Sequence, residues 1–195
     1  MNSLLSIKDD VLNEVIIKKS KFITFLFRVD CSDDIKNHLD QLSLKYKDAT
    51  HICYAYILDN VKRFSDDGEP GGTAGMPILN VLESKGLNHI LCCVVRYFGG
   101  TKLGANGLVR AYSNGCCDAL GCANIVNLLP GKICSIRFRY EDTKVIDNVL
   151  RDCSIINKEY GNDVIYYFKI SINNLSILNN YDFEIIDDCF IEKNW

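Results

Sequence analysis

The amino-acid sequence predicts an α+β protein of two domains, and three observations lead to this expectation. The chain has 195 residues, which allows one large domain or two small ones at ~150 residues per domain. Its content of 48% hydrophobic and 24% charged residues is typical of a folded globular protein. Stretches rich in β-branched and aromatic residues are interspersed with stretches whose apolar residues recur at helical spacing.

The first part of the chain combines strands with amphipathic helices. Clusters of β-branched and aromatic residues predict strands at 15–17, 22–29, 51–58, 90–98 and 125–129. Apolar residues that return every three or four positions predict helices at 33–45, 77–84 and 106–120. Ser32 precedes the first of these helices, and Thr73 is placed to cap the second. The polar, glycine-rich segment 59–75 is expected to be a long loop, a kind of segment that often carries function.

A second series of elements begins after Pro130 and Gly131, the one plausible domain boundary. The expected elements are a strand at 133–140, a helix at 145–150, strands at 155–160 and 164–172, a short helix at 176–180 and a strand at 183–191. This is the order of a ferredoxin-like βαββαβ unit. We therefore expect one domain at residues 1–129 and a ferredoxin-like domain at residues 130–195.

Bulk charge does not identify a partner for this chain. Twenty-two basic residues stand against 25 acidic ones, so the formal charge is −3 and any nucleic-acid site must be a local patch. Lys8, Asp9 and Asp10 interrupt the N-terminal segment before it reaches signal-peptide length. No later run reaches the ~18 apolar residues of a membrane span. The sequence predicts a cytoplasmic protein without membrane contact, and it does not indicate an oligomeric state.

The ten cysteines do not show the spacing of a metal or redox site. They occur as two adjacent pairs and as single residues, without a CxxC motif. Free cysteine is among the most buried residue types. We therefore expect reduced, mostly packed thiols, with no metal and no cofactor.

An acidic, glycine-rich segment follows the predicted strand at 51–58. Asp66, Asp67 and Glu69 place three carboxylates within four positions. They could bind a hard cation, although the spacing lacks the alternating ligands of an EF-hand loop. They could act as acid and base together with His51, if the strand carries that side chain beside the loop. They could equally form a solvated turn in which the carboxylates accept hydrogen bonds from local backbone amides.

A second glycine-rich segment connects a buried strand to a helix, at residues 94–110. This arrangement leaves backbone N–H groups free at the positive end of the helix, which favours an anion. Lys102, with Arg96 or Arg110, would add charge-assisted hydrogen bonds to a phosphate. The spacing matches neither GxxxxGK[ST] nor GxGxxG. Alternatively, the glycines only allow close packing and Arg96 forms a structural ion pair. The candidate anion-binding residues are Arg96, Gly99, Gly100, Lys102, Gly104, Asn106, Gly107 and Arg110.

The segments SDDGEPGGTAGMPIL and VVRYFGGTKLGANGLVRAY, with HICYAY ahead of them, closely resemble the Impact family, called the YigZ family in bacteria. The likeness covers roughly residues 18–121. It implies an N-terminal domain similar to the second domain of a small-subunit ribosomal protein, a β-sheet covered by helices. For bacterial members it also implies a C-terminal ferredoxin-like domain resembling a late domain of elongation factor G. Asn106 stands where the family usually has glycine.

The resemblance also implies a second motif loop. Its residues are His51, Asp66, Asp67, Glu69, Gly71, Gly72, Thr73 and Gly75. Eukaryotic Impact proteins resemble regulators of translation. The leading hypothesis is therefore a non-enzymatic, translation-associated regulator that binds RNA or a ribosome-associated protein through residues 99–110. The alternative is a metal-assisted or acid-base hydrolase built from the carboxylate cluster and His51. A third hypothesis is a protein-interaction module that uses Tyr97, Phe98 and Tyr112.

Overall fold

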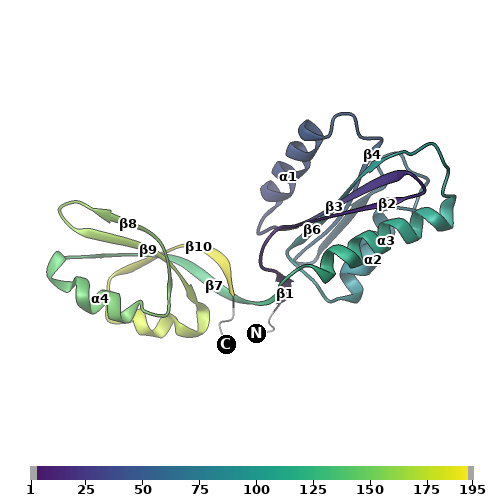
Figure 1. Cartoon of the computed structure of the whole chain (residues 1–195). Coiled ribbons are helices and arrows are strands. Elements are labelled where there is room, and N and C mark those ends of the chain that lie inside the picture. Colours follow the sequence, from purple (N-terminus) through teal and green to yellow (C-terminus); the bar gives the residue numbers. More distant parts are fainter. Residues whose placement is uncertain (1–3, 193–195) are drawn as a thin grey trace. The chain divides into compact units, whose positions relative to one another are not determined.

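A computed structural model describes residues 4–192 of the chain (Figure 1). The chain divides into two compact units, with the division between Val126 and Asn127. Each unit has its own hydrophobic core. The α+β class and the two-domain organisation predicted from the sequence are confirmed. No helix among the described residues is long and apolar enough to cross a membrane.

The N-terminal unit is built on a five-stranded antiparallel sheet with the order β2-β3-β6-β4-β5. Its strands are β2 (Val11–Ile17), β3 (Ser20–Arg28), β4 (His51–Leu58), β5 (Val61–Ser65) and β6 (Ile90–Tyr97). A short strand, β1 (Leu4–Ile7), precedes them and forms a bridge with Leu87. The central strand β6 is buried at every position except Tyr97, as its continuous apolar run predicts.

Helices cover both faces of this sheet. Helix α1 (Ser32–Lys45) lies on one face, and α2 (Gly75–Ser84) and α3 (Ala105–Gly121) lie on the other (Figure 1). The alternation of side chains along β6 explains the two cores. Cys92 and Val94 pack with α2 and α3, whereas Cys93 and Val95 pack with α1. The sheet is therefore the middle of three layers.

The second unit carries the predicted βαββαβ order. Its elements are β7 (Ile125–Phe138), a 3-10 turn η1 (Tyr140–Asp142), α4 (Thr143–Val149), β8 (Ser154–Tyr160), β9 (Val164–Ser171), a 3-10 helix η2 (Ile172–Leu178) and β10 (Phe183–Glu192). Within this unit β10 pairs with β7, β7 with β9 and β9 with β8, all antiparallel. The α-helix expected at 176–180 is replaced by the 3-10 helix η2. The element order is otherwise that of a ferredoxin-like unit.

The strands expected at 125–129 and 133–140 form one continuous strand, because β7 runs through Pro130 and Gly131. Pro130 has no N–H to donate to a neighbouring strand, and a strand interior tolerates it where one side is unpaired. It pairs with β10 only, because the pairing with β9 begins at Gly131. Gly131 permits a close approach of strands: an added Cβ would lie 2.9 Å from the Ile170 carbonyl oxygen. The residues that suggested a turn are thus accommodated within a strand.

The expected loop at 59–75 is also shorter than predicted, since it contains the strand β5. The sequence VKRFS gives no alternating apolar pattern, and four of the five residues of β5 are exposed. The strand forms because its backbone pairs with β4. The hydrophobic pattern of the sequence does not reveal that pairing, because most side chains of β5 face solvent. The functional loop therefore begins only at Asp66.

Candidate functional site

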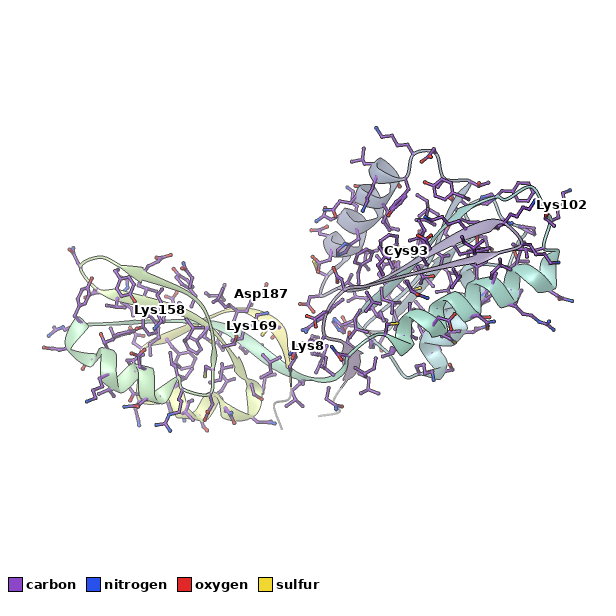
Figure 2. All side chains as sticks on the ribbon, viewed as in Figure 1. Lys8, Cys93, Lys102, Lys158, Lys169 and Asp187 are labelled. Atoms are coloured by element: carbon purple, nitrogen blue, oxygen red, sulfur yellow. The ribbon has the colours of Figure 1, made fainter. Side chains whose placement is uncertain are left out.

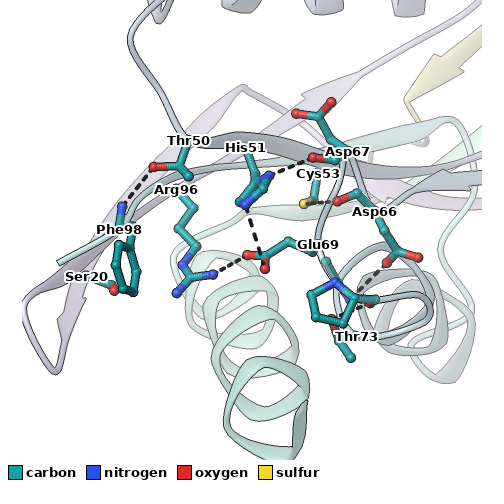
Figure 3. A network of polar contacts seen from close by, with 12 residues as sticks. Ser20, Thr50, His51, Cys53, Asp66, Asp67, Glu69, Thr73, Arg96 and Phe98 are labelled. Carbon is teal, nitrogen blue, oxygen red and sulfur yellow. Dashed lines mark hydrogen bonds and ion pairs between the residues drawn. The ribbon is translucent and has the colours of Figure 1, made fainter. Parts of the chain in front are cut away.

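The two glycine-rich loops leave β5 and β6, the two strands of the N-terminal sheet that pair with β4 on either side. Residues 66–74 connect β5 to α2, and residues 98–104 connect β6 to α3. Figure 3 shows that side chains from β4, from the first loop and from β6 converge in one polar network. The network contains His51, Glu69 and Arg96, three residues that the sequence assigned to two different segments.

Asp66 organises the first loop by accepting hydrogen bonds from backbone amides. Its Oδ2 accepts from Gly72 at 2.8 Å, and its Oδ1 accepts from Ala74 at 3.0 Å and from Gly75 at 2.8 Å. These amides lie at the start of α2, where a helix leaves N–H groups without intrahelical partners. The prediction that Thr73 caps this helix is wrong, because the Thr73 hydroxyl donates to the Pro70 carbonyl at 2.6 Å. Asp66 takes that role.

Asp67 ties the loop to the start of β4. Its Oδ2 accepts a hydrogen bond from the Ile52 N–H at 2.5 Å. Its backbone carbonyl accepts from His51 Nδ1 at 2.7 Å, which places the proton on that nitrogen. Asp67 has φ +43 and Gly68 has φ +82, so the chain turns sharply at this point. The carboxylate of Asp67 is therefore occupied in holding the loop against the sheet.

Glu69 is the centre of the buried network. Its Oε1 accepts hydrogen bonds from Arg96 Nη1 at 2.5 Å and from the Tyr112 hydroxyl at 2.7 Å. His51 Nε2 lies 3.9 Å from Oε2. The side chains of Glu69 and Arg96 are only 3% and 6% exposed. The Arg96 guanidinium also lies 5.4 Å from the Phe22 ring and 5.7 Å from the Phe98 ring, which provides cation–π contacts.

Neutral groups complete the network below Glu69. Burial raises the pKa of Cys53 to about 12. Burial, together with Cys53, raises the pKa of Tyr112 far above its usual value. The Cys53 thiol lies 3.0 Å from the Asp66 carbonyl oxygen and 3.4 Å from the Tyr112 hydroxyl. Both side chains therefore stay protonated at neutral pH and act as hydrogen-bond donors.

The acidic loop thus has a structural role for each of its carboxylates. Asp66 caps α2, Asp67 binds β4, and Glu69 neutralises Arg96. Within residues 4–192 no group of three His, Cys, Asp or Glu side chains is arranged to hold a metal ion. Of the three interpretations left open by the sequence, the hydrogen-bonded turn describes this loop, although Glu69 is buried further than a solvated turn implies.

The start of the second loop is also engaged within the protein. The Phe98 N–H donates to Thr50 Oγ1 at 2.9 Å, and the Gly99 N–H donates to Ser20 Oγ at 3.1 Å. A Cβ at Gly99 would lie 2.0 Å from the Lys19 carbonyl carbon. Glycine is therefore required here by the close approach of the β2–β3 turn, and this amide does not face a ligand.

The end of the second loop is open, in contrast. Gly104 precedes α3 with φ +75 and provides no side-chain cap. In the described part of the chain, no hydrogen-bond partner is found for the amides of Ala105, Asn106 and Gly107. Lys102 lies at the outer end of this loop (Figure 2). Both Lys102 and Arg110 are exposed, and no salt bridge to either is present among residues 4–192.

The sequence-predicted site residues therefore separate into two groups. His51, Asp66, Asp67, Glu69 and Arg96 form the buried network, with Arg96 in the structural ion pair that the sequence left as an alternative. Lys102, Asn106 and Arg110 form the exposed group, with Gly104 and Gly107 in the backbone between them and Gly100 two residues before Lys102. Gly71 and Gly72 lie in the Asp66 turn, and Gly75 packs against Ser65. Arg96 is thus not available to an anion in the exposed group.

Sequence reasoning missed four members of the network. Cys53 was expected only as a packed thiol, and Tyr112 was considered for a protein-interaction surface. Ser20 and Thr50 were not singled out. One signal was present for Cys53: two positions after His51 on the same strand, it must lie on the same face of the sheet. Ser20, Thr50 and Tyr112 come from distant elements, and no local pattern connects them to the loops.

The fold and these loops define a two-domain α+β protein whose N-terminal sheet carries a buried Glu–Arg network beside an open helix start. The chain belongs to the Impact family, since residues 18–120 match the Impact N-terminal domain. It is 35% identical over 162 residues to the IMPACT family member YvyE of Bacillus subtilis, covering 82% of this chain and 75% of YvyE. It is 38% identical over 151 residues to YigZ of Escherichia coli, covering 74% of each.

A solved structure agrees over nearly the whole length. A crystal structure of a hypothetical protein shares 31% sequence identity with a TM-score of 0.67, and the alignment covers 95% of this chain and 97% of the other. The family resemblance stated from the two motif segments is confirmed. The family model lies entirely within the unit that contains both loops.

Proposed function

We propose that this protein is a translation-associated regulator of the cytoplasm that binds RNA through the N-terminal turn of α3. The observation that carries the proposal is the combination of two features. The amides of Ala105, Asn106 and Gly107 have no partner within residues 4–192, and the exposed cations Lys102 and Arg110 form no ion pair within the same residues. Amides at the positive end of a helix and nearby cations favour phosphate groups. The role in translation follows from the family resemblance.

The alternative hydrolase receives less support. Acid-base chemistry needs a titratable group that can reach a substrate, whereas Glu69 is buried and bound to Arg96 and Tyr112. Asp66 and Asp67 accept hydrogen bonds from the backbone. Among residues 4–192, the contacts of the His51 ring nitrogens are with the Asp67 carbonyl and with Glu69, and neither is a nucleophile of the Ser, Thr or Cys type. The geometry of the network favours a rigid support for the α3 loop over a reacting centre.

The proposal is tested by measuring the affinity for single-stranded RNA as a function of salt, with fluorescence polarisation of a labelled oligouridine. Each phosphate contact on a single strand contributes a log–log slope of about −0.7. The double variant Lys102→Ala, Arg110→Ala should bind more weakly at low salt, with a slope less steep by about 1.4. A double variant that binds as tightly as the wild type at low salt would overturn the proposal.

A matched control removes the same charge elsewhere. Lys144 and Arg151 are exposed and lie in the second unit, outside the α3 loop. The double variant Lys144→Ala, Arg151→Ala should retain the wild-type affinity and slope. Equal loss in both double variants would show that net charge, rather than the start of α3, determines the binding.

A further inference from the structure

Two tyrosines of β4 form an ordered aromatic pair on the sheet face that carries α1. The rings of Tyr54 and Tyr56 have centroids 6.5 Å apart and planes that differ by 10°. The alternation of β4 explains their direction: Cys53, Ala55 and Ile57 are buried in the core under α2 and α3, so the tyrosines must lie on the opposite face. The pair is thus on the other side of the sheet from α3.

The tyrosine pair is only partly covered. Helix α1 packs on the cluster formed by this face of β3, β4 and β6. Side chains in the middle of that cluster, such as Leu91 and Cys93, are fully buried. Tyr54 and Tyr56 lie at the margin of that cluster and are both of intermediate exposure. The neighbouring strand β5 is the edge of the sheet. Ring surface therefore remains accessible to a planar group that approaches over β5.

An exposed cation stands beside the rings. Arg63 of β5 is directly opposite Tyr56 in the antiparallel register, and opposed residues share one face of a sheet. The side chain is exposed, and no hydrogen bond or ion pair to it is found within residues 4–192. A solvent-facing guanidinium next to two parallel rings can bind a phosphate, while the rings contact the attached base.

We propose that Tyr54, Tyr56 and Arg63 form a stacking surface for unpaired bases of single-stranded RNA. Sheet-borne aromatic residues commonly bind RNA in this way, because every base has a flat face and stacking tolerates any sequence. The inference rests on the proposed function, since it assigns the bases of the same ligand whose phosphates bind at α3. The tyrosine surface lies on the sheet face opposite α3, and it would bind the bases of the RNA through stacking, whereas the start of α3 would bind the phosphates.

The nearby groups are compatible with this ligand. Burial raises the pKa of Tyr54, with further contributions from Tyr56, Cys93 and Asp67, so the phenol stays neutral at physiological pH. The carboxylate of Asp67 is the acidic group that affects Tyr54, and it accepts a hydrogen bond from the Ile52 N–H. The negative charge of that carboxylate disfavours a nearby phosphate, whereas the positive charge of Arg63 favours one.

The experiment compares two probes of equal length and charge, an oligouridine and an abasic oligonucleotide, with wild-type protein and variants. Wild type should bind the oligouridine more tightly than the abasic probe. Tyr54→Ala and Tyr56→Ala should each weaken oligouridine binding by about five- to tenfold, within the range measured for loss of one base stack. Binding of the abasic probe and the salt slope should be unchanged.

Conservative variants separate stacking from folding. Tyr54→Phe and Tyr56→Phe keep the ring and should retain the wild-type preference for bases. Thermal unfolding of each variant shows whether the fold is intact. Phe variants as weak as the Ala variants, or Ala variants that bind the oligouridine as wild type does, would overturn the inference, and the second result would favour a protein ligand for this surface.

The two proposals fail in different ways. If wild-type protein binds neither probe, the proposed function itself is wrong. If it binds both probes equally and the Lys102→Ala, Arg110→Ala variant lowers both affinities, RNA binding at α3 stands and only the stacking surface is rejected. If the tyrosine variants lose only the preference for bases, both stand.

Discussion

Glu69 and Arg96 form an ion pair inside the N-terminal unit, in which the two side chains are 3% and 6% exposed. Two charges removed from water need mutual compensation and further hydrogen bonds. Tyr112 supplies one of these to Glu69. The pair joins the acidic loop to the central strand β6, and through Tyr112 to α3. It therefore connects both glycine-rich loops through a single carboxylate.

Removing one partner of this pair should be strongly destabilising. We expect Arg96→Met to lower the free energy of unfolding by about 3–5 kcal/mol, because Glu69 is left as a buried charge without its cation. The double variant Glu69→Gln, Arg96→Met should be more stable than Arg96→Met alone. Urea denaturation followed by circular dichroism measures both values.

The exposed pair Lys62–Glu83 provides the control, since its side chains are 51% and 39% exposed. Glu83→Ala should change stability by less than about 1 kcal/mol. Equal costs for Arg96→Met and Glu83→Ala would mean that burial of the Glu69–Arg96 pair has no energetic consequence.

Asp66 should be required for the start of α2. Its carboxylate accepts three backbone N–H groups, and loss of a helix cap costs typically about 1 kcal/mol and up to about 2 kcal/mol. With three donors left unpaired, we expect Asp66→Ala to cost at least about 2 kcal/mol. Hydrogen exchange should show lost protection at Gly72, Ala74 and Gly75. The exposed Asp9→Ala serves as the control, and unchanged protection in Asp66→Ala would contradict the assignment.

Gly99 should tolerate no side chain. An added Cβ would lie 2.0 Å from the Lys19 carbonyl carbon and 2.4 Å from the Ser20 nitrogen, and both are backbone atoms that cannot rotate away. We expect Gly99→Ala to lower the free energy of unfolding by about 3 kcal/mol or more, at the upper end for overpacked sites. Gly71→Ala is the matched variant, because no atom lies within 4 Å of its added Cβ. Similar melting temperatures for the two variants would refute the close approach.

Cys53 should make the protein less stable in alkali. Its pKa is raised from 9.0 to about 12 by burial, so above pH 9 the unfolded chain releases a proton that the folded chain keeps. The stabilising contribution is complete below pH 9 and declines as pH rises toward 12. The stability gap between wild type and Cys53→Ala should therefore shrink by about 1–2 kcal/mol between about pH 8 and about pH 10.5. A constant gap would show that this thiol ionises freely in the folded protein.

Periodicity predicted most elements of this chain. The apolar run at β6, the helical spacing in α1 and α3, and the βαββαβ order of the second unit are all readable from the sequence, because each depends on neighbours a few residues away. Strand β5 and the continuity of β7 were missed. Both depend on backbone pairing with a partner strand, and the side chains carry no record of that pairing.

The sequence by itself determined the class of fold, the family and the position of the two glycine-rich motif segments. Only the tertiary structure decided what their charges do. Arg96 and Lys102 lie in the same motif segment, yet Arg96 is buried against Glu69 and Lys102 is exposed. The physical reason is register: Arg96 lies opposite Phe22 and His51 on the inner strand β6, where a cation must have a partner, whereas Lys102 follows the end of that strand in solvent.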